Sequence, residues 1–313
     1  MNLPEPIAWT GDSIKILDQR ALPGEERYME ARTPADVAEG IRAMAIRGAP
    51  LIGIAGGYGM ALAFLRGEDP ASAKNALANS RPTAVNLFKA IERVYGSADP
   101  IREAITIHEE EKARCLMIAK HGASLIKQGS AVLTHCNTGA LATGGLGTAL
   151  GVIYESWRLG RVRMVWVDET RPWLQGARLT CWELGRVGVP HTLIVDSLAS
   201  FLMSKGEVDA VIVGADRVAR NGDFANKVGT LALAISARHF GIPFYVAAPS
   251  TSFDPDLPDG SCIPIEERPE EEVLSFRGVR VAPHEAHALN YAFDITPREL
   301  VSAYITEEGI REA

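Results

Sequence analysis

Apolar residues recur along the chain with two different spacings, and the change falls near residue 130. Before that point, segments 34–46, 50–66, 83–95 and 98–128 carry apolar residues at helical spacing. The stretch PIAWTGDSIKILDQ alternates apolar and polar residues, which predicts a β-hairpin. We therefore expect residues 1–128 to form a smaller, mostly helical N-terminal domain with a short hairpin.

From residue 130 onward, apolar runs rich in β-branched residues alternate with segments of helix length. The runs are AVLTH, VRMVWVD, HTLIVD, VDAVIVG, IPFYVAA and GVRVA. Strands that are continuously apolar are buried on both faces, which predicts a mostly parallel sheet covered by helices. Residues 129–313 should therefore form a Rossmann-like α/β domain. Ligands bind outside the carboxyl ends of such strands, which singles out the residues that follow the runs: Cys136, Asp168, Asp196, Asp216 and Pro249.

Composition and charge limit the partners and the location that we expect for this protein. Of the 313 residues, 47% are hydrophobic and 23% are charged, as in an ordinary soluble globular protein. The net charge of −7 leaves no basic face for phosphate backbones, so we expect no nucleic-acid partner. The longest apolar run, APLIGIAGGYGMALAFL, is rich in glycine and too short to cross a bilayer comfortably. We expect a cytoplasmic protein that does not contact a membrane.

The cysteines and histidines do not form a metal-binding pattern. Cysteines stand at positions 115, 136, 181 and 262 without C-x-x-C spacing, which favours reduced thiols. His284 and His287 form an isolated H-x-x-H with no further ligand at a suitable spacing, so we interpret them as surface residues. We expect no metal.

Cations stand where helices are expected to begin, and this favours an anion site. Arg47, Arg81 and Arg171 each lie at or just before a probable helix start with a proline in the first turn. Asn226 and Lys227 repeat the pattern, as N-cap and first turn of a helix running to Phe240. A cation at this end of a helix costs up to about 1 kcal/mol, unless an anion binds beside it. The alternative to an anion site is that all four cations are solvated residues on the surface.

A dinucleotide site is a weaker alternative. The segment GGLGTALG follows a predicted strand, and Asp168 ends the next strand about 20 residues later. However, Leu150 stands where the fingerprint needs a third small residue. The loop before the glycines is also too long for the usual tight turn. We expect no NAD and no other cofactor.

Cys136 and Asp216 each allow a structural and a catalytic interpretation. A free cysteine is most often a small buried residue, but a thiol between a strand end and a helix start should have a lowered pKa. The neighbouring His135 should point to the opposite face and so serve in packing or support. Asp216 is either a turn residue or an acid that keeps its proton in an apolar crevice.

Six long segments, in order along nearly the whole chain, resemble the methylthioribose-1-phosphate isomerase family. Its relatives include ribose-1,5-bisphosphate isomerases and the regulatory subunits of translation initiation factor two B. The matching segments are AIRGAPLIGIAGGYGMAL, SRPTAVNL, LTHCNTGALAT, DETRPWLQGARLTCWEL, VDAVIVGADRVARNGDFANKVGT and AFDITPREL.

The resemblance implies conversion of an aldose 1-phosphate into its ketose 1-phosphate, above all of 5-methylthioribose 1-phosphate in methionine salvage. It implies Cys136 and Asp216 as catalytic residues, and a homodimer. The implied substrate-binding residues are Arg47, Gly48, Ala49, Arg81, Gln175, Asn226 and Lys227. The alternative is the same chemistry on 5-deoxyribose 1-phosphate or ribose 1,5-bisphosphate. A non-catalytic regulatory subunit or a NAD-binding protein is a less favoured interpretation.

Overall fold

The N-terminal part of the chain packs helices against a small antiparallel sheet. In this computed structural model, which describes residues 1–81 and 84–312, the expected hairpin gains a third strand. The strands are β1 (Ile7–Trp9), β2 (Ile14–Leu17) and β3 (Tyr28–Ala31). The helices are α1 (Pro34–Arg42), α2 (Ala49–Arg66), α3 (Pro70–Ala78), α4 (Val85–Tyr95) and α5 (Pro100–Ala123). Helix α3 was not predicted, and the expected start of α4 at residue 83, with Pro82 before it, lies outside the described residues.

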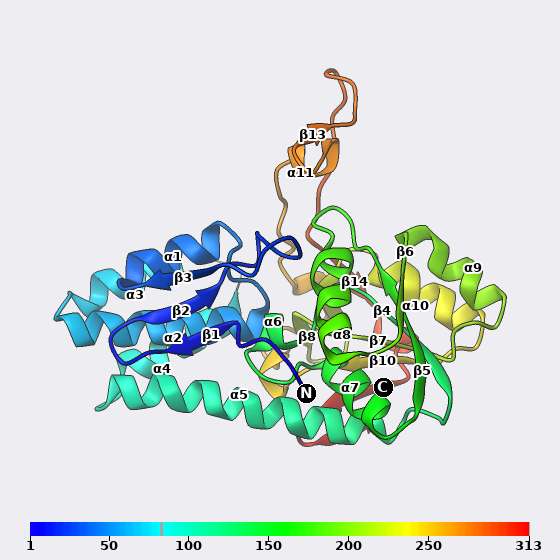
Figure 1. The fold of residues 1–313 in the computed structure, drawn as a ribbon, viewed down its shortest axis with the longest axis horizontal. Coiled ribbons are helices and arrows are strands. Elements are labelled where there is room, and N and C mark those ends of the chain that lie inside the picture. Colours follow the sequence, from blue (N-terminus) through cyan, green and yellow to red (C-terminus); the bar gives the residue numbers. More distant parts are fainter. Residues whose placement is uncertain (82–83, 313) are drawn as a thin grey trace.

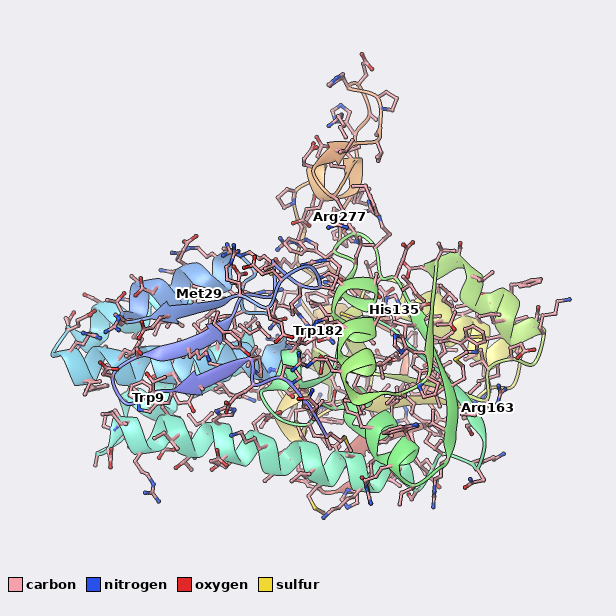
Figure 2. All side chains as sticks on the ribbon, viewed as in Figure 1. Trp9, Met29, His135, Arg163, Trp182 and Arg277 are labelled. Carbon is pink, nitrogen blue, oxygen red and sulfur yellow. The ribbon has the colours of Figure 1, made fainter. Side chains whose placement is uncertain are left out.

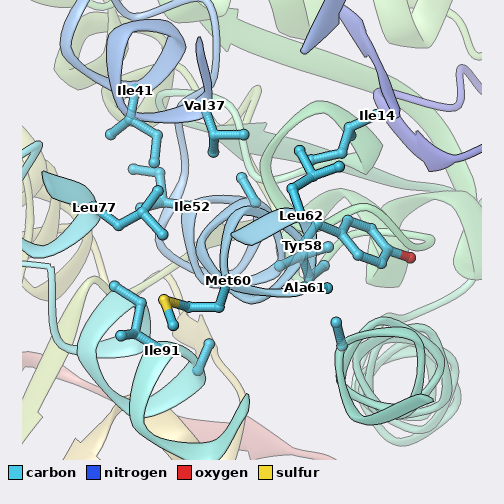
Figure 3. Packing of buried hydrophobic residues seen from close by; sticks show 14 of the residues in the cluster. Ile14, Val37, Ile41, Ile52, Tyr58, Met60, Ala61, Leu62, Leu77 and Ile91 are labelled. Carbon is cyan, nitrogen blue, oxygen red and sulfur yellow. The ribbon is translucent and has the colours of Figure 1, made fainter. Parts of the chain in front are cut away.

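Helix α2 is the centre of this part's hydrophobic core (Figure 3). Glycines let its neighbours approach closely: a Cβ on Gly56 would lie 2.4 Å from Leu87 Cδ1 of α4. It is the one described helix long and apolar enough to cross a membrane, and 72% of it is buried inside the protein. We therefore interpret α2 as the core helix of a globular protein.

A seven-stranded sheet organises the rest of the chain (Figure 1). Its order is β16-β15-β10-β7-β4-β5-β6, and all neighbours are parallel except β15 and β16. The strands are β4 (Ser130–Thr134), β5 (Val162–Asp168), β6 (His191–Ile194), β7 (Ala210–Val213), β10 (Phe244–Ala247), β15 (Ala303–Thr306) and β16 (Gly309–Glu312). This confirms the predicted mostly parallel, Rossmann-like sheet. The last two strands were not predicted.

Helices cover both faces of the sheet. On one face, side chains of α5, α7 (Ala149–Arg158) and α8 (Cys181–Val187) share a hydrophobic cluster with the strands. On the other face, α9 (Ala199–Ser204) and α10 (Thr230–His239) do the same. The short helix α6 (Ala140–Thr143) and a π-helical turn (Gly176–Thr180) lie between strand ends and the longer helices.

Strands outside the large sheet correct two predictions, and most of them form a second, smaller sheet. Its order is β11-β8-β9-β14, with β8 (Arg217–Ala219), β9 (Phe224–Lys227), β11 (Phe253–Asp254) and β14 (Phe293–Thr296). Asn226 and Lys227 therefore belong to a strand, and the N-cap of α10 is Gly229. The run GVRVA does not join the large sheet either: among the described strands, β13 (Val279–Arg280) pairs with β12 (Ser275–Phe276) alone. With α11 (Glu271–Leu274), they form an arm that projects from the molecule (Figure 1).

Helix α5 packs on both parts of the chain. Ala104 and Ile107 belong to the core around α2, whereas Ile118 belongs to the core beneath the large sheet. Figure 1 shows the helix running along both parts. A domain boundary at residues 128–129 stays a prediction, because the helix that precedes it contributes to both cores.

Glu111 on α5 gives the fold a predicted pH dependence. The residue is 4% exposed, and burial raises its pKa to about 7 despite Arg114 Nη1 at 3.3 Å. An acid with a raised folded-state pKa contributes stability below its unfolded pKa and loses it as the pH rises through about 7. The loss amounts to about 3 kcal/mol, at about 1.4 kcal/mol per pKa unit.

We therefore expect the unfolding free energy of the wild type to fall, relative to that of Glu111→Gln, between about pH 5 and pH 8. Urea denaturation of both proteins across this range measures the difference. Parallel stability curves would contradict the assignment.

Candidate active site at the carboxyl ends of the strands

A single pocket collects the two catalytic and seven substrate-binding residues that the family resemblance implied. Strand order in the large sheet changes direction between β4 and β7, and such a switch point is where ligands bind in open α/β sheets. The pocket lies at these strand ends and against the start of α2. Its lining includes Arg47, Gly48, Ala49, Arg81, Cys136, Gln175, Asp216, Asn226 and Lys227.

The backbone holds Cys136 in a fixed position at the end of β4. Its φ of +63° lies in the left-handed region, which is unusual for a residue with a side chain. The amide N–H donates to Thr170 Oγ1 at 2.9 Å, and the carbonyl accepts from Thr180 Oγ1 at 2.6 Å. Strained backbone of this kind persists only where its surroundings determine it, and it occurs often at functional sites.

The pKa of Cys136 differs from the expected one. Burial raises the pKa of this thiol, while the charges of Arg47 and Lys227 act in the lowering direction. The predicted field of a following helix is small, because α6 has only four residues. The expectation of a lowered pKa was therefore wrong in the pocket as it stands.

Asp216 follows β7 across the switch point. Its N–H donates to Ala225 O at 2.9 Å, which anchors the residue to the small sheet. Burial raises the pKa of its carboxyl group, against the opposing effect of Lys227, Arg81 and Arg47. This confirms the expected direction: the acid is held closer to its protonated form than a solvated aspartate.

Three of the four predicted cations converge on the pocket. Arg47 donates to Asn137 Oδ1 at 2.5 Å and to Asn137 O at 2.8 Å, and burial lowers its pKa. Lys227 Nζ donates to Ala292 O at 2.8 Å, and burial lowers its pKa as well. Arg81 Nη2 pairs with Glu266 Oε2 at 3.1 Å. A phosphate bound among these groups would stabilise their charged forms.

Arg171 lies elsewhere. It is not among the described residues that line the pocket. Its Nη2 donates to Val273 O at 3.0 Å, and its guanidinium lies over the Phe276 ring in the projecting arm. The anion interpretation therefore suits the other three cations, whereas Arg171 holds the arm.

Gln175 and Asn226 bring amide groups to the pocket. Gln175 is 4% exposed, and its Oε1 has no hydrogen-bond partner among the described residues. A buried carbonyl oxygen without a partner costs free energy, which a ligand hydroxyl would recover. Asn226 Nδ2 donates to Thr230 Oγ1 at 2.9 Å, which orients the amide beside Lys227.

Gly48 is required by the conformation that starts α2. Its φ is +91°, and a Cβ at this position would lie 2.5 Å from Ala142 O. We expect Gly48→Ala to move the Arg47–Ala49 turn, to raise KM at least about tenfold, and to lower stability by about 1–3 kcal/mol. Substrate titration and thermal unfolding measure these effects.

Gly67→Ala is the matched control, because Gly67 ends the same helix at φ +66° with open space around it. It should lower stability only and leave KM unchanged. Equal KM values for the two variants would contradict a role for the Gly48 turn in binding.

Sequence reasoning missed Glu183, which supports the loop after Cys136. The residue is fully buried on α8, and its carboxylate accepts from Asn137 Nδ2 at 2.8 Å and from the Ala140 N–H at 2.7 Å. Asn137 in turn holds Arg47. A charged residue inside the apolar segment LTCWEL was the available signal, since a buried carboxylate needs donors.

The glycines after Cys136 approach other parts of the protein. A Cβ on Gly147 would lie 2.7 Å from Thr138 O, and one on Gly145 would lie 3.2 Å from Cys115 Sγ. These contacts explain the glycine-rich segment without a dinucleotide.

One described cluster has ligand types that suit a metal. The side-chain ligand atoms of His135, Asp168 and Asp196 lie within 4.8 Å of one another. However, His135 Nδ1 is bonded to Asp168 Oδ2 at 2.9 Å, and both Asp196 oxygens accept backbone N–H groups of Thr170 and Arg171. A cation would have to displace these bonds, so we assign the cluster to the protein's own hydrogen-bond network. His287, by contrast, is a surface residue with a side chain 89% exposed.

Comparison with known proteins identifies the family. The model of the Initiation factor 2 subunit family matches residues 45–313, so the chain belongs to this family.

Individual relatives are similar over nearly their whole length. A methylthioribose-1-phosphate isomerase of Thermus thermophilus is 56% identical over 94% of this chain and 90% of its own. The crystal structure of 5-methylthioribose 1-phosphate isomerase from Pyrococcus horikoshii OT3 matches with a TM-score of 0.91 and 41% identity, covering 99% of this chain and 93% of that one. A structure named translation initiation factor eIF-2B, subunit delta, from A. fulgidus matches with a TM-score of 0.86 and 42% identity, covering 98% and 95%.

Proposed function

We propose that this protein is an aldose–ketose isomerase that converts 5-methylthioribose 1-phosphate into 5-methylthioribulose 1-phosphate in methionine salvage. The observation that carries the proposal is the convergence of Cys136, Asp216 and three cations on one pocket at the switch point. Relatives at 51–56% identity that bear the isomerase name support it.

Ring opening is the first chemical task. Phosphate on the anomeric oxygen leaves the sugar without a free aldehyde, so the C1–O4 bond must break with help from an acid. Asp216 suits this step, because burial raises its pKa and so favours the protonated form that an acid catalyst needs. Arg47, Arg81 and Lys227 are the proposed phosphate ligands, with Gly48 and Ala49 at the start of α2.

Hydrogen transfer from C2 to C1 is the second task, and Cys136 acts in either of two routes. As a base, its thiolate would take the C2 proton and give an enediolate-like intermediate. In a hydride shift, it would position or deprotonate the C2 hydroxyl. Turnover in D₂O separates the routes, because only the proton route can place solvent deuterium at C1.

The C5 substituent defines the substrate among sugars of this class. Ile263, Pro264 and Phe293 give the pocket an apolar wall, which suits a methylthio group. The test is a panel of ribose 1-phosphates that differ only at C5, with ketose formation followed by NMR. We expect the methylthio sugar to have the highest kcat/KM. Equal rates across the panel would overturn the narrow substrate, and no turnover of any member would favour a regulatory protein.

We also propose that the protein is a cytoplasmic homodimer. Strand β6 is an edge of the large sheet and carries Leu193 at 47% exposure, and Phe201 on α9 is 55% exposed. These apolar side chains support association of two copies, which light scattering would detect as twice the 33.7 kDa chain mass. Four unpaired cysteines suit a reducing compartment.

A further inference from the structure

His135 lies directly before Cys136 but does not face the pocket. It is 1% exposed, and Figure 2 shows it within the part of the molecule built on the large sheet. Its Nδ1 lies 2.9 Å from Asp168 Oδ2 at the end of β5, and its Nε2 lies 2.9 Å from Val228 O. The side chain therefore joins three chain segments: the ends of β4 and β5, and the residue after Lys227.

The two partners fix the protons on this ring. A carbonyl oxygen only accepts, so Nε2 carries a hydrogen toward Val228. A second proton must then lie between Nδ1 and Asp168 Oδ2, because two lone pairs would otherwise face each other in a dry site. Burial raises the pKa of Asp168 to about 6, and the bond to this carboxyl group raises the pKa of His135 despite burial. Both directions favour a pair that keeps its proton.

The ring also packs against the start of α10. A Cβ on Gly229 would lie 2.9 Å from His135 Cε1, so the turn after Lys227 rests on the imidazole. The N–H of Gly229 donates to Asp294 Oδ2 at 2.7 Å, which closes the turn from the other side. Loss of the imidazole would leave this turn without its support and Val228 O without its donor.

We infer that His135, together with Asp168, is a positioning residue that fixes Cys136 relative to Lys227 and Asn226. The inference rests on the proposed isomerase function of the pocket. The imidazole acts as a protonated strut between the strand end that carries the thiol and the turn that follows the lysine. Thr170 extends the strut, because its hydroxyl donates to Asp168 O and accepts the N–H of Cys136.

Several charged groups face this pair and set the pH at which its proton leaves. They are Glu169 directly after β5, Asp196 beyond the end of β6, and Asp294 on β14. The carboxylates favour the protonated imidazole, and burial opposes it. Because these effects are mixed, the experiment follows the ring protons directly.

The test compares His135→Ala, Asp168→Ala and Asp168→Asn. Both alanine variants remove the strut, and we expect kcat to fall about 10- to 100-fold in protein that is still folded. Asp168→Asn can donate its amide N–H to a neutral Nδ1, so we expect kcat and KM within about threefold of the wild type. His191→Ala, at the beginning of β6, is the control and should keep wild-type kcat.

Proton NMR gives a readout that a merely structural residue would not move. We expect two low-field ring N–H signals from His135 in the wild type and one in Asp168→Asn. Wild-type kcat and KM in folded His135→Ala, or a single ring N–H signal in the wild type, would overturn the inference.

Failure of the proposed function has a different signature. A wild type without isomerase activity would overturn that function alone. The strut would still be tested by the NMR signals and by the affinity for inorganic phosphate, which we expect to weaken at least about fivefold in His135→Ala as Lys227 moves. Unchanged phosphate affinity in that variant would count against the strut.

Discussion

Replacing Cys136 by serine is expected to lower kcat by about 10²- to 10⁴-fold, the usual contribution of a positioned acid–base group. The serine hydroxyl fills nearly the same space but is a far weaker acid, so almost none of it is ionised to act as a base. The backbone at position 136 is held by Thr170 and Thr180, so the fold should survive the change. Single-turnover kinetics with 5-methylthioribose 1-phosphate measures the loss.

The wild type should also respond to pH in a defined direction. Burial raises the pKa of Cys136, so the thiolate fraction grows as the pH rises through the neutral range. If the thiolate is the base, the rate on a ring-opened substrate analogue, which does not need the acid Asp216, rises with pH until the pKa of Cys136 is reached, and Cys136→Ser lacks this rise. Cys262→Ser, at an exposed position, is the control and should behave as the wild type. Full activity in folded Cys136→Ser would refute the catalytic assignment.

Asp216→Asn is expected to reduce kcat by a similar factor, about 10²- to 10⁴-fold, because an amide cannot deliver a proton to the ring oxygen. The raised pKa keeps part of the wild-type carboxyl group protonated above the usual range. Acid catalysis is therefore fully available below that pKa, and it is lost as the pH rises through it. The pH profile of kcat/KM in the wild type should contain this falling limb.

The Asp216→Asn variant should lack this falling limb of the pH profile of kcat/KM. Asp256→Asn, in an exposed loop, provides the matched control. A ring-opened substrate analogue sharpens the experiment: if Asp216 acts only in ring opening, the variant should process the open form at a nearly wild-type rate. An unchanged pH profile in Asp216→Asn would exclude Asp216 as the acid.

The strongly patterned elements of the fold were predictable from the sequence. Buried parallel strands such as β5 and β7 are continuous apolar runs, and α2 and α5 show helical spacing over many residues. Local pattern could not place the small sheet, because β9 pairs with β14 across a long stretch of chain. The same long-range pairing explains the wrong helix assignment for Asn226 and Lys227.

The site was predictable where a strand end fixes the position of a residue. Cys136 and Asp216 follow β4 and β7, and the strand order brings those ends together. Supporting contacts were harder to foresee, because they join residues distant in sequence. Glu183 reaches the loop after Cys136 from α8, and Asp294 bonds the first N–H groups of α10 from β14. No local spacing encodes such contacts.

Helix α5 also constrains the order in which the protein can be completed during synthesis. Its last turns pack against β15 and β16: His121 Nδ1 bonds Thr306 O at 2.9 Å, and Gly122 leaves room for Ile305. The ribosome releases α5 long before those strands, so the part of its last turns that faces β15 and β16 must wait uncovered while the intervening chain is translated. We expect this helix to be the surface that a chaperone would shield in the nascent chain, until the arrival of β15 completes the core.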